Sequence, residues 1–523
     1  MGEQGLFALA LAIAVVMITG RAVASRLEVP EPIVLVMLGV LASLIPHVPS
    51  VDLPPDVVLL VFVPPLVYYA AFLSAPRETR ENAVPITGLA IGATTVTIVG
   101  VGWVTRLLLP DLGWAPALAF AAAVAPTDAV AATSVMTRLG APTRVVTIIE
   151  GESLINDGVA LTAFGLAVEA MAHPFTFGHG LLRLTEVVGG GIAYGLVVAV
   201  VIGRLRRHIH DPAIQILVSL IIPFVAYIPA EQLDISGVLA TVVTGAYLGT
   251  RTEGLFQPSS RAAGTLFWQM LIFLLESTLF VLLGLELRSI VGHVSGALPA
   301  PWLAAAAAAV VATAIAIRLA WELAISPLVR FLPAPHPAFV RHPLEHRLVI
   351  GWAGMRGAIS LAVALSLPTM LNGRPFGQRS TLIFLAAVVV VVTLIGQGLT
   401  LAPLVRVLGL AERDQRQRAE ASARAKVTGA GLARLDELAE AGTVDGNTAN
   451  LYRQLLELRL ERVRVALGDA SADDIPDTSG PRQELVRAQR DKLAQLYRDG
   501  EISDDIRRSI SRSLDLQEPR PFR

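Results

Sequence analysis

Long apolar runs alternate with short polar breaks over most of the chain. The runs are mostly of about 17 to 25 residues, rich in Leu, Val, Ile, Ala and Phe, and the breaks hold charged or turn-forming residues. A helix of this length crosses a hydrocarbon layer of roughly 30 Å. The pattern predicts thirteen membrane-spanning helices, at about 5–20, 29–46, 56–75, 84–108, 114–137, 143–171, 181–203, 212–229, 234–250, 264–287, 300–326, 345–368 and 380–405.

Composition agrees with an all-α polytopic membrane protein. Of the 523 residues, 54% are apolar and 16% are charged, and the mean hydropathy is +0.61. The absence of Cys excludes disulfides, iron–sulfur clusters and thiol catalysis. The lysines, Lys426 and Lys492, are followed by Val and Leu, so no phosphate-binding loop of the GxxxxGK[ST] kind exists. We therefore expect neither an enzyme with its own ATPase nor a cofactor, and no nucleic-acid partner.

Arginine distribution predicts the orientation. By this map fourteen arginines lie in loops on one side of the membrane and five on the other. Because cytoplasmic loops carry the excess of positive charge, we expect the N-terminus outside and the C-terminus in the cytoplasm. The compactness of the chain and its short tail favour a bacterial plasma (inner) membrane.

The composition changes at Ala411. Charged residues make up 41 of the last 113 positions, against 44 of the first 410. We therefore expect a membrane domain at 1–410 and a helical cytoplasmic tail at 411–523. Within the tail, 431–467 predicts two helices around a Gly/Asp turn, 469–480 a linker and 501–514 a short helix. The tail either packs or dimerises, or it responds to an unknown ligand or partner.

Polar residues inside the apolar runs are the candidates for function, because a charge near the bilayer centre costs about 2.5 to 3.5 kcal/mol on insertion scales. The fifth run places Thr127 and Asp128 directly after Pro126. Proline lacks an amide hydrogen and frees carbonyls about one turn back, near Ala122. An opened helix beside a carboxylate offers the oxygen ligands that Na⁺ prefers.

The sixth run carries a polar face. Glu152 and Asn156 lie four residues apart, as do Ser153 and Asp157, so all four fall within an arc of roughly 140° of one helix. We expect them to face one cavity. A buried polar knot that holds helices together is the structural alternative, but two acids on one face require a cation or a proton.

The twelfth run adds Arg356 among Gly351, Gly354 and Gly357. These glycines permit close approach or local unwinding, and Arg356 is the expected countercharge of Glu152. The fifth and twelfth runs are seven spans apart and so run in opposite directions. This arrangement is typical of an inverted repeat in which two broken helices cross near the middle of the membrane.

Other intramembrane charges are weaker candidates. Glu276 lies in the tenth run, and Arg318 and Glu322 lie four residues apart in the eleventh. They form either a secondary polar shell or an internal ion pair that serves packing.

The motifs, in their order along the chain, resemble the monovalent cation:proton antiporters of the NhaP and sodium/proton exchanger type. The matching stretches are APTDAVA, EGESLINDGVAL, SGVLATVVTGAYLG, FVLLGLEL and GMRGAISLA, across residues 5–405. The sequence departs from this pattern mainly at Glu276, where relatives often have a neutral residue.

The resemblance implies roles for individual residues. Asp128 and Asp157 would bind the cation, assisted by Ser153 and the Thr127 backbone. Glu152 would organise the site together with Asn156, and Arg356 would pair with Glu152. The family also implies a homodimer, and a core of six helices that moves against a dimerisation scaffold.

Exchange of Na⁺ for protons by alternating access follows as the expected function, with K⁺ and Li⁺ left open. A carboxylate taken out of water holds either a proton or a cation, so the two compete for the same oxygens. Position 156 is Asn rather than a second acid beside Asp157, and no Lys lies in the membrane runs to act as the extra proton carrier that the resemblance to electrogenic relatives would require, so we expect electroneutral exchange.

Two rival functions remain. A cation channel could use the same carboxylates without moving protons. The stretch HPLEH fits the H-x-x-E-H zinc pattern through His342, Glu345 and His346, which would indicate a membrane metallopeptidase. Its internal proline and the lack of a third ligand argue against that reading.

Overall fold

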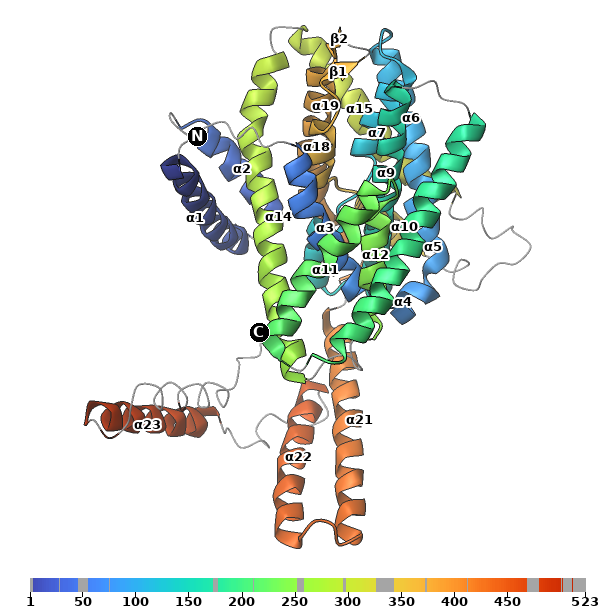
Figure 1. The fold of residues 1–523 in the computed structure, drawn as a ribbon. Helices are drawn as coiled ribbons and strands as arrows, with labels where there is room; N and C mark the ends of the chain where they lie inside the picture. The colour runs from blue at the N-terminus through green and yellow to red at the C-terminus, as the bar shows by residue number, and fades with distance from the viewer. Residues whose placement is uncertain are drawn as a thin grey trace. The chain divides into compact units, whose positions relative to one another are not determined.

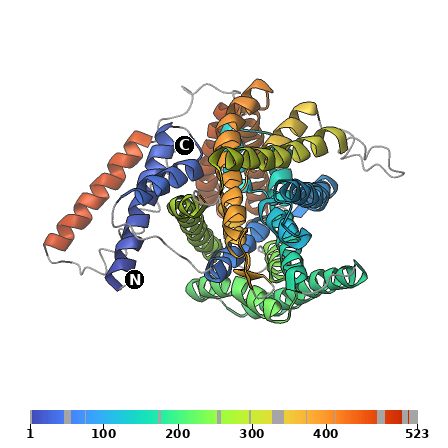
Figure 2. The same ribbon diagram turned by 90° about the horizontal axis from the view of Figure 1, so that it is seen from above.

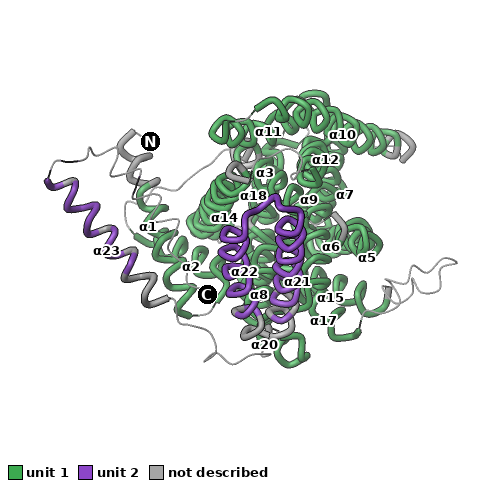
Figure 3. Tube along the Cα trace, turned by 90° about the horizontal axis from the view of Figure 1, so that it is seen from below, with its two compact units in different colours: residues 1–412 green, residues 413–523 purple. Residues whose placement is uncertain are grey.

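The structure is a computed structural model. It describes residues 3–27, 29–45, 55–74, 76–172, 177–209, 211–251, 258–294, 298–325, 343–371, 374–411, 413–467, 479–499, 501 and 510. The chain divides into two compact units, 1–412 and 413–523, coloured separately in Figure 3.

The first unit is a bundle of helices (Figure 1). Its elements are α1 (Glu3–Leu27), α2 (Glu31–Ser43), α3 (Pro55–Leu73), α4 (Pro76–Glu81), α5 (Ala83–Thr87), η1 (Gly88–Ala93), α6 (Thr94–Leu108), α7 (Trp114–Val124), α8 (Ala129–Leu139), α9 (Thr143–Ala172), α10 (Phe177–Arg206), α11 (Pro212–Gln232), α12 (Gly237–Gly249), α14 (Pro258–Val294), α15 (Ala300–Ala320), η2 (Trp321–Ile325), α17 (Leu344–Trp352), α18 (Ala358–Leu365), α19 (Arg379–Val392), η4 (Thr393–Gln397) and α20 (Gly398–Val407). The segments η1, η2 and η4 are π-helical. A short antiparallel hairpin, β1 (Met370–Leu371) and β2 (Arg374–Pro375), follows α18.

Helices occupy every one of the predicted runs. Among the described residues, eight helices are long and apolar enough to cross a membrane: Ala83–Leu108, Trp114–Leu139, Thr143–Ala172, Leu182–Arg206, Pro212–Gln232, Arg261–Gly292, Ala300–Ala324 and Arg379–Val407. Three shorter apolar helices lie at Glu31–Ser43, Leu60–Leu73 and Gly237–Gly249. The chain is therefore a mainly helical, multi-pass membrane protein, while the count of thirteen crossings and the inverted repeat stay predictions.

Two of the predicted runs are interrupted at mid-length, as expected. The fifth is divided into α7 and α8 by a non-helical stretch at 125–128, and the twelfth into α17 and α18 by one at 353–357. Pro126 accounts for the first interruption, because proline cannot continue the ladder of backbone hydrogen bonds. The helix opens at Val124, two residues later than the freed carbonyl predicted near Ala122.

The interrupted helices lie in the apolar core of the first unit. The helix pair α7/α8 packs against α9, and α18 contacts α7, α19 and α3. On another side of the unit, α12 packs between α10 and α3, with α11 beside it (green helices at the lower edge of Figure 2). The long helix α14 packs along α2.

Glycines bring α2 and α14 into backbone contact. A Cβ atom at Gly39 would lie 2.5 Å from the carbonyl oxygen of Val281, and one at Gly284 would overlap the carbonyl oxygen of Val36. Small residues at such crossings allow the close approach on which packing in lipid depends.

The second unit contains a helical hairpin. α21 (Arg413–Glu440) and α22 (Gly446–Leu467) pack together around the predicted turn, in which Gly442 has a φ of +67°. Asp445 caps α22 by accepting hydrogen bonds from the backbone of Asn447 and Thr448. Hydrogen bonds from Thr448 also lower the pKa of this carboxyl. A further helix, α23 (Ser479–Arg498), was not predicted, and 501–514 lies largely outside the described residues.

We predict that Gly284→Ala destabilises the protein by about 1 to 3 kcal/mol, because the added methyl group forces α2 and α14 apart. The melting temperature of the purified protein in detergent measures this change. Gly264→Ala is the matched control, since it lies on the same helix with open space around it. Equal melting temperatures for the two variants would contradict the prediction.

Candidate ion-binding site

The two interrupted helices meet at their breaks. The backbone N–H of Asp128 donates a hydrogen bond to the carbonyl oxygen of Met355 at 2.7 Å. Unwound backbone inside a membrane has no water to bond, so each break satisfies a polar group of the other. The two breaks therefore meet, as the sequence predicts, while their position at the middle of the membrane stays a prediction.

Asp128 lies at two helix N-termini. It caps α8, where its Oδ1 accepts a hydrogen bond from the N–H of Val130 at 2.8 Å. Gly357 precedes the first turn of α18, and a Cβ there would lie 2.5 Å from Oδ2 of Asp128. Because helix N-termini carry partial positive charge, both half-helices favour the ionised carboxylate.

Arg356 binds the C-terminal ends of α7 and α17, the two half-helices that precede the breaks. Its Nε donates to the carbonyl of Val124, the last residue of α7, at 3.2 Å, and its Nη1 donates to the carbonyl of Gly354, just after α17, at 2.5 Å. Its backbone N–H donates to Oγ1 of Thr393 at 3.1 Å. Helix C-termini carry partial negative charge and unpaired carbonyls, both of which a buried guanidinium satisfies.

Glu152 pairs with Arg318, so the predicted pairing of Glu152 with Arg356 is wrong. The Arg318 guanidinium engages both carboxylate oxygens, with Nη1 on Oε1 and Nη2 on Oε2 at 2.6 Å. The side chains are 5% and 1% exposed, so this is a fully buried, two-point ion pair. The sequence holds a signal for Arg318, which lies within an apolar run, but its spacing to Glu322 leaves open whether it belongs to a polar shell or to an internal ion pair that serves packing.

A chain of hydrogen bonds joins this ion pair to the first break. Thr127 Oγ1 donates to Glu152 Oε1 at 3.2 Å and accepts from Nδ2 of Asn156 at 2.9 Å. Ser153 Oγ accepts from the backbone N–H of Ala129 at 3.3 Å. Glu152, Asn156 and Ser153 therefore fix the position of the break against α9.

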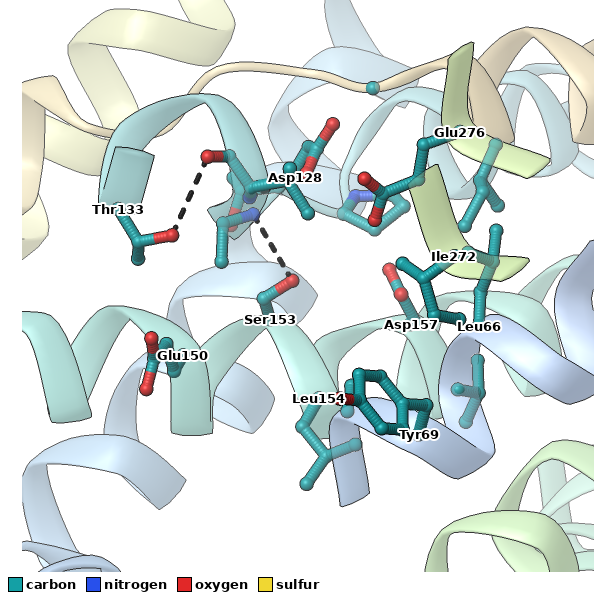
Figure 4. A pocket seen from close by; sticks show the side chains of 18 of the residues that line it. Leu66, Tyr69, Asp128, Thr133, Glu150, Ser153, Leu154, Asp157, Ile272 and Glu276 are labelled. Carbon is teal, nitrogen blue, oxygen red and sulfur yellow. Dashed lines mark hydrogen bonds between the residues drawn. The ribbon is translucent and has the colours of Figure 1, made fainter. Parts of the chain in front are cut away.

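A cavity of about 540 Å³ opens beside the crossing. Asp128, Asp157 and Ser153 line it, together with Thr127 and Glu276 from α14. Figure 4 shows the carboxylates of Asp157 and Glu276 directed into the same space as Asp128.

The expected arc of four polar residues is therefore divided between two environments. Ser153 and Asp157 line the cavity, whereas Glu152 and Asn156 are 1% and 0% exposed and lie in the hydrogen-bonded network behind it. The prediction of a single cavity-facing group of four is wrong for these two. Helical spacing places the four residues on one side of α9. It does not show that Glu152 pairs with Arg318 and therefore lies in the network rather than on the cavity wall.

Comparison with known proteins identifies the architecture. The family model described as "Sodium/hydrogen exchanger, transmembrane" matches residues 11–407. The chain belongs to this family. This family consists of transporters of the antiporter type.

Individual sodium/hydrogen exchangers match over nearly the whole chain. An uncharacterized Na⁺/H⁺ exchanger of Mycobacterium tuberculosis is 33% identical, over 99% of this chain and 97% of its own. The low-affinity Na⁺/H⁺ antiporter NhaS1 of Synechocystis is 30% identical, over 96% and 88%. The solved structure of the sodium proton antiporter MjNhaP1 from Methanocaldococcus jannaschii has the same fold, with a TM-score of 0.62, 19% identity, and 78% and 99% coverage.

The zinc-site reading gains no support from the geometry. Glu345 and His346 lie in the first turn of α17, with Pro343 at its N-cap, and His342 lies outside the described residues. Within the described part of the chain, no group of three His, Asp or Glu side chains is placed to hold a metal ion.

We predict that Arg318→Met lowers stability by about 3 to 5 kcal/mol, because it leaves Glu152 buried without a countercharge. The double variant Glu152→Leu/Arg318→Met should recover much of this loss. Melting temperatures of the purified proteins test the cycle. Arg183→Met is the control, since the ion pair of Arg183 with Glu169 at 3.7 Å is partly exposed and worth about 0 to 1 kcal/mol. Strict additivity of the two single changes would refute the coupling.

Proposed function

We propose that this protein exchanges a monovalent cation, Na⁺ first, for protons, and that both ions compete for Asp128 and Asp157. The observation that carries the proposal is the presence of these two carboxylates on one cavity at the crossing of the broken helices. Membership of the sodium/hydrogen exchanger family supplies the class of reaction.

Site geometry supports competition between the ions. Asp128 is held by the N-terminus of α8, which it caps, and lies beside Gly357 at the start of α18, so its carboxylate is oriented before any ion arrives. Asp157 reaches the same cavity from α9, where Ser153 adds a hydroxyl oxygen. The Thr127 backbone assists from the break. Carboxylate, hydroxyl and carbonyl oxygens are the ligands that hard cations prefer, and a proton on either carboxylate removes one of them.

Alternating access is the proposed route. The two crossed breaks would form part of a six-helix core that carries the site past a dimerisation scaffold, and the core would cross only when a cation or protons occupy it. The protein would act as a homodimer in the plasma (inner) membrane, in the lipid bilayer, with its N-terminus outside and its C-terminal tail in the cytoplasm. Its role would be sodium and pH homeostasis, with K⁺ and Li⁺ as further possible substrates.

Electroneutral exchange is the proposed stoichiometry. Asn156, which follows Ile155 and precedes Asp157, is neutral, and its amide donates to Thr127 rather than facing the cavity. One cation of charge +1 would therefore exchange for one proton at the Asp128/Asp157 pair. A channel that uses the same carboxylates is the alternative, and it would conduct cations without countertransport of protons.

We expect Asp157→Asn to abolish exchange, because the amide is nearly isosteric but carries no charge to bind a cation. Everted vesicles holding an imposed proton gradient provide the test: addition of Na⁺, Li⁺ or K⁺ should dissipate the gradient with the intact protein and leave it with the variant. Glu169→Gln, on the same helix but outside the cavity, is the matched control and should exchange normally. Failure of every cation to dissipate the gradient between pH 6 and 9, with protein present in the membrane, would overturn the proposed function.

Electroneutrality predicts that the exchange rate is independent of membrane potential. The dependence can be measured in proteoliposomes. The Na⁺ and proton gradients are kept the same, and the membrane potential is varied with K⁺ and an ionophore. A transport current whose direction follows the potential would show that the stoichiometry is not one to one.

A further inference from the structure

Glu276 is the one carboxylate on the main cavity that comes from neither broken helix nor α9. It lies at the midpoint of α14, where its companions on the cavity wall, Ile272, Leu279 and Phe280, are apolar. A carboxylate in the centre of such a helix is costly in a membrane and requires an ion or a donor to offset the cost. Within the part of the chain that the structure describes, no hydrogen bond or ion pair reaches its side chain.

The position of Glu276 places it between two spaces. Together with Val130 and Phe280, it lines both the main cavity and a second cavity of about 330 Å³. The second cavity also holds Arg21, Glu31 and Arg138. The guanidinium of Arg21 stacks over the ring of Phe273, 4.6 Å from its centroid. The Glu276 carboxylate itself is directed into the main cavity, toward Asp128 and Asp157 (Figure 4).

We propose that Glu276 is a third carboxylate ligand of the transported cation. This inference rests on the proposed function and deepens it. Asp128 and Asp157 supply oxygens from α8 and α9, and Glu276 supplies one from the facing helix, so a bound cation joins α14 to the crossing of the broken helices. Among the described residues no three acidic side chains lie close enough together to hold a metal ion, so this proposal requires opposite walls of the cavity to close on the cation, and its size decides whether all three carboxylates reach it at once.

Specificity follows from this arrangement. Two carboxylates on adjacent helices define one side of the site, and the distance across the cavity to α14 defines the other. A smaller ion gains less from Glu276 than one that spans the gap. Loss of Glu276 should therefore change the relative affinities for Li⁺, Na⁺ and K⁺, as well as weakening the binding of the preferred ion.

Glu276→Gln is expected to raise the half-saturating concentration of the preferred cation about tenfold, with the maximal rate largely retained. Exchange measured over a range of Na⁺, Li⁺ and K⁺ concentrations in proteoliposomes gives both quantities. Glu286→Gln is the matched control, because Glu286 lies on the same helix but lines neither cavity. A half-saturating concentration within twofold of the unchanged protein, with the same order of cations, would overturn the inference.

Two further readouts separate ligand binding from a structural role. Glu276→Asp keeps the charge on a side chain shorter by one methylene group, so its half-saturating concentration should lie between those of the intact protein and Glu276→Gln, and this variant also serves if the Gln variant does not fold. Thermal stabilisation of the purified protein by added Na⁺ or Li⁺ should need a correspondingly higher concentration in Glu276→Gln. A lower melting temperature with an unchanged cation response would show a packing role only. If the unchanged protein itself does not exchange, the proposed function fails first.

Discussion

The need to satisfy unwound backbone inside a membrane governs this structure. Two helices stop halfway across, and each leaves N–H and carbonyl groups that lipid cannot bond. The hydrogen bond from Asp128 to Met355 satisfies one group of each break, and the guanidinium of Arg356 satisfies two carbonyls at once. The carboxylates of Asp128 and Asp157 line a cavity, where a cation or a proton can offset the cost of a charge within a membrane-spanning segment.

Two of the deeply buried arginines, Arg356 and Arg318, solve different electrostatic problems. Arg356 neutralises the negative ends of α7 and α17, and Arg318 neutralises the carboxylate of Glu152. Neither lines the cavity, so neither competes directly with a cation for Asp128 or Asp157. The two arginines therefore stabilise the helix ends and the buried Glu152 carboxylate, while Asp128 and Asp157 on the cavity wall stay free to bind a cation.

Local chemistry made much of this predictable. Pro126 marks the first break, the glycines around Arg356 mark the second, and a spacing of four residues places Ser153 and Asp157 together. Charge pairing was the weak point. Arg356 lies among glycines in a run that holds few other charges, which favours it as the partner of Glu152. The packing of α15 against its neighbours, which the sequence does not show, brings Arg318 to that acid instead. For the same reason the sequence could not show that, among the polar residues of α9, Ser153 and Asp157 line the cavity whereas Glu152 and Asn156 lie in the hydrogen-bonded network behind it. The sequence also could not predict that Glu276 lies on the same cavity as Asp128 and Asp157, because the periodicity of α14 does not show which other helices it faces.

The contact between the two breaks is made by main-chain atoms. Asp128 donates through its amide and Met355 accepts through its carbonyl, so the contact does not depend on which side chains occupy these positions. Evolution can therefore vary the chemistry of the cavity wall while the frame that supports it persists. Homologues that prefer different ions need not differ in architecture, and a laboratory search for altered selectivity can substitute side chains along the wall without first rebuilding the fold.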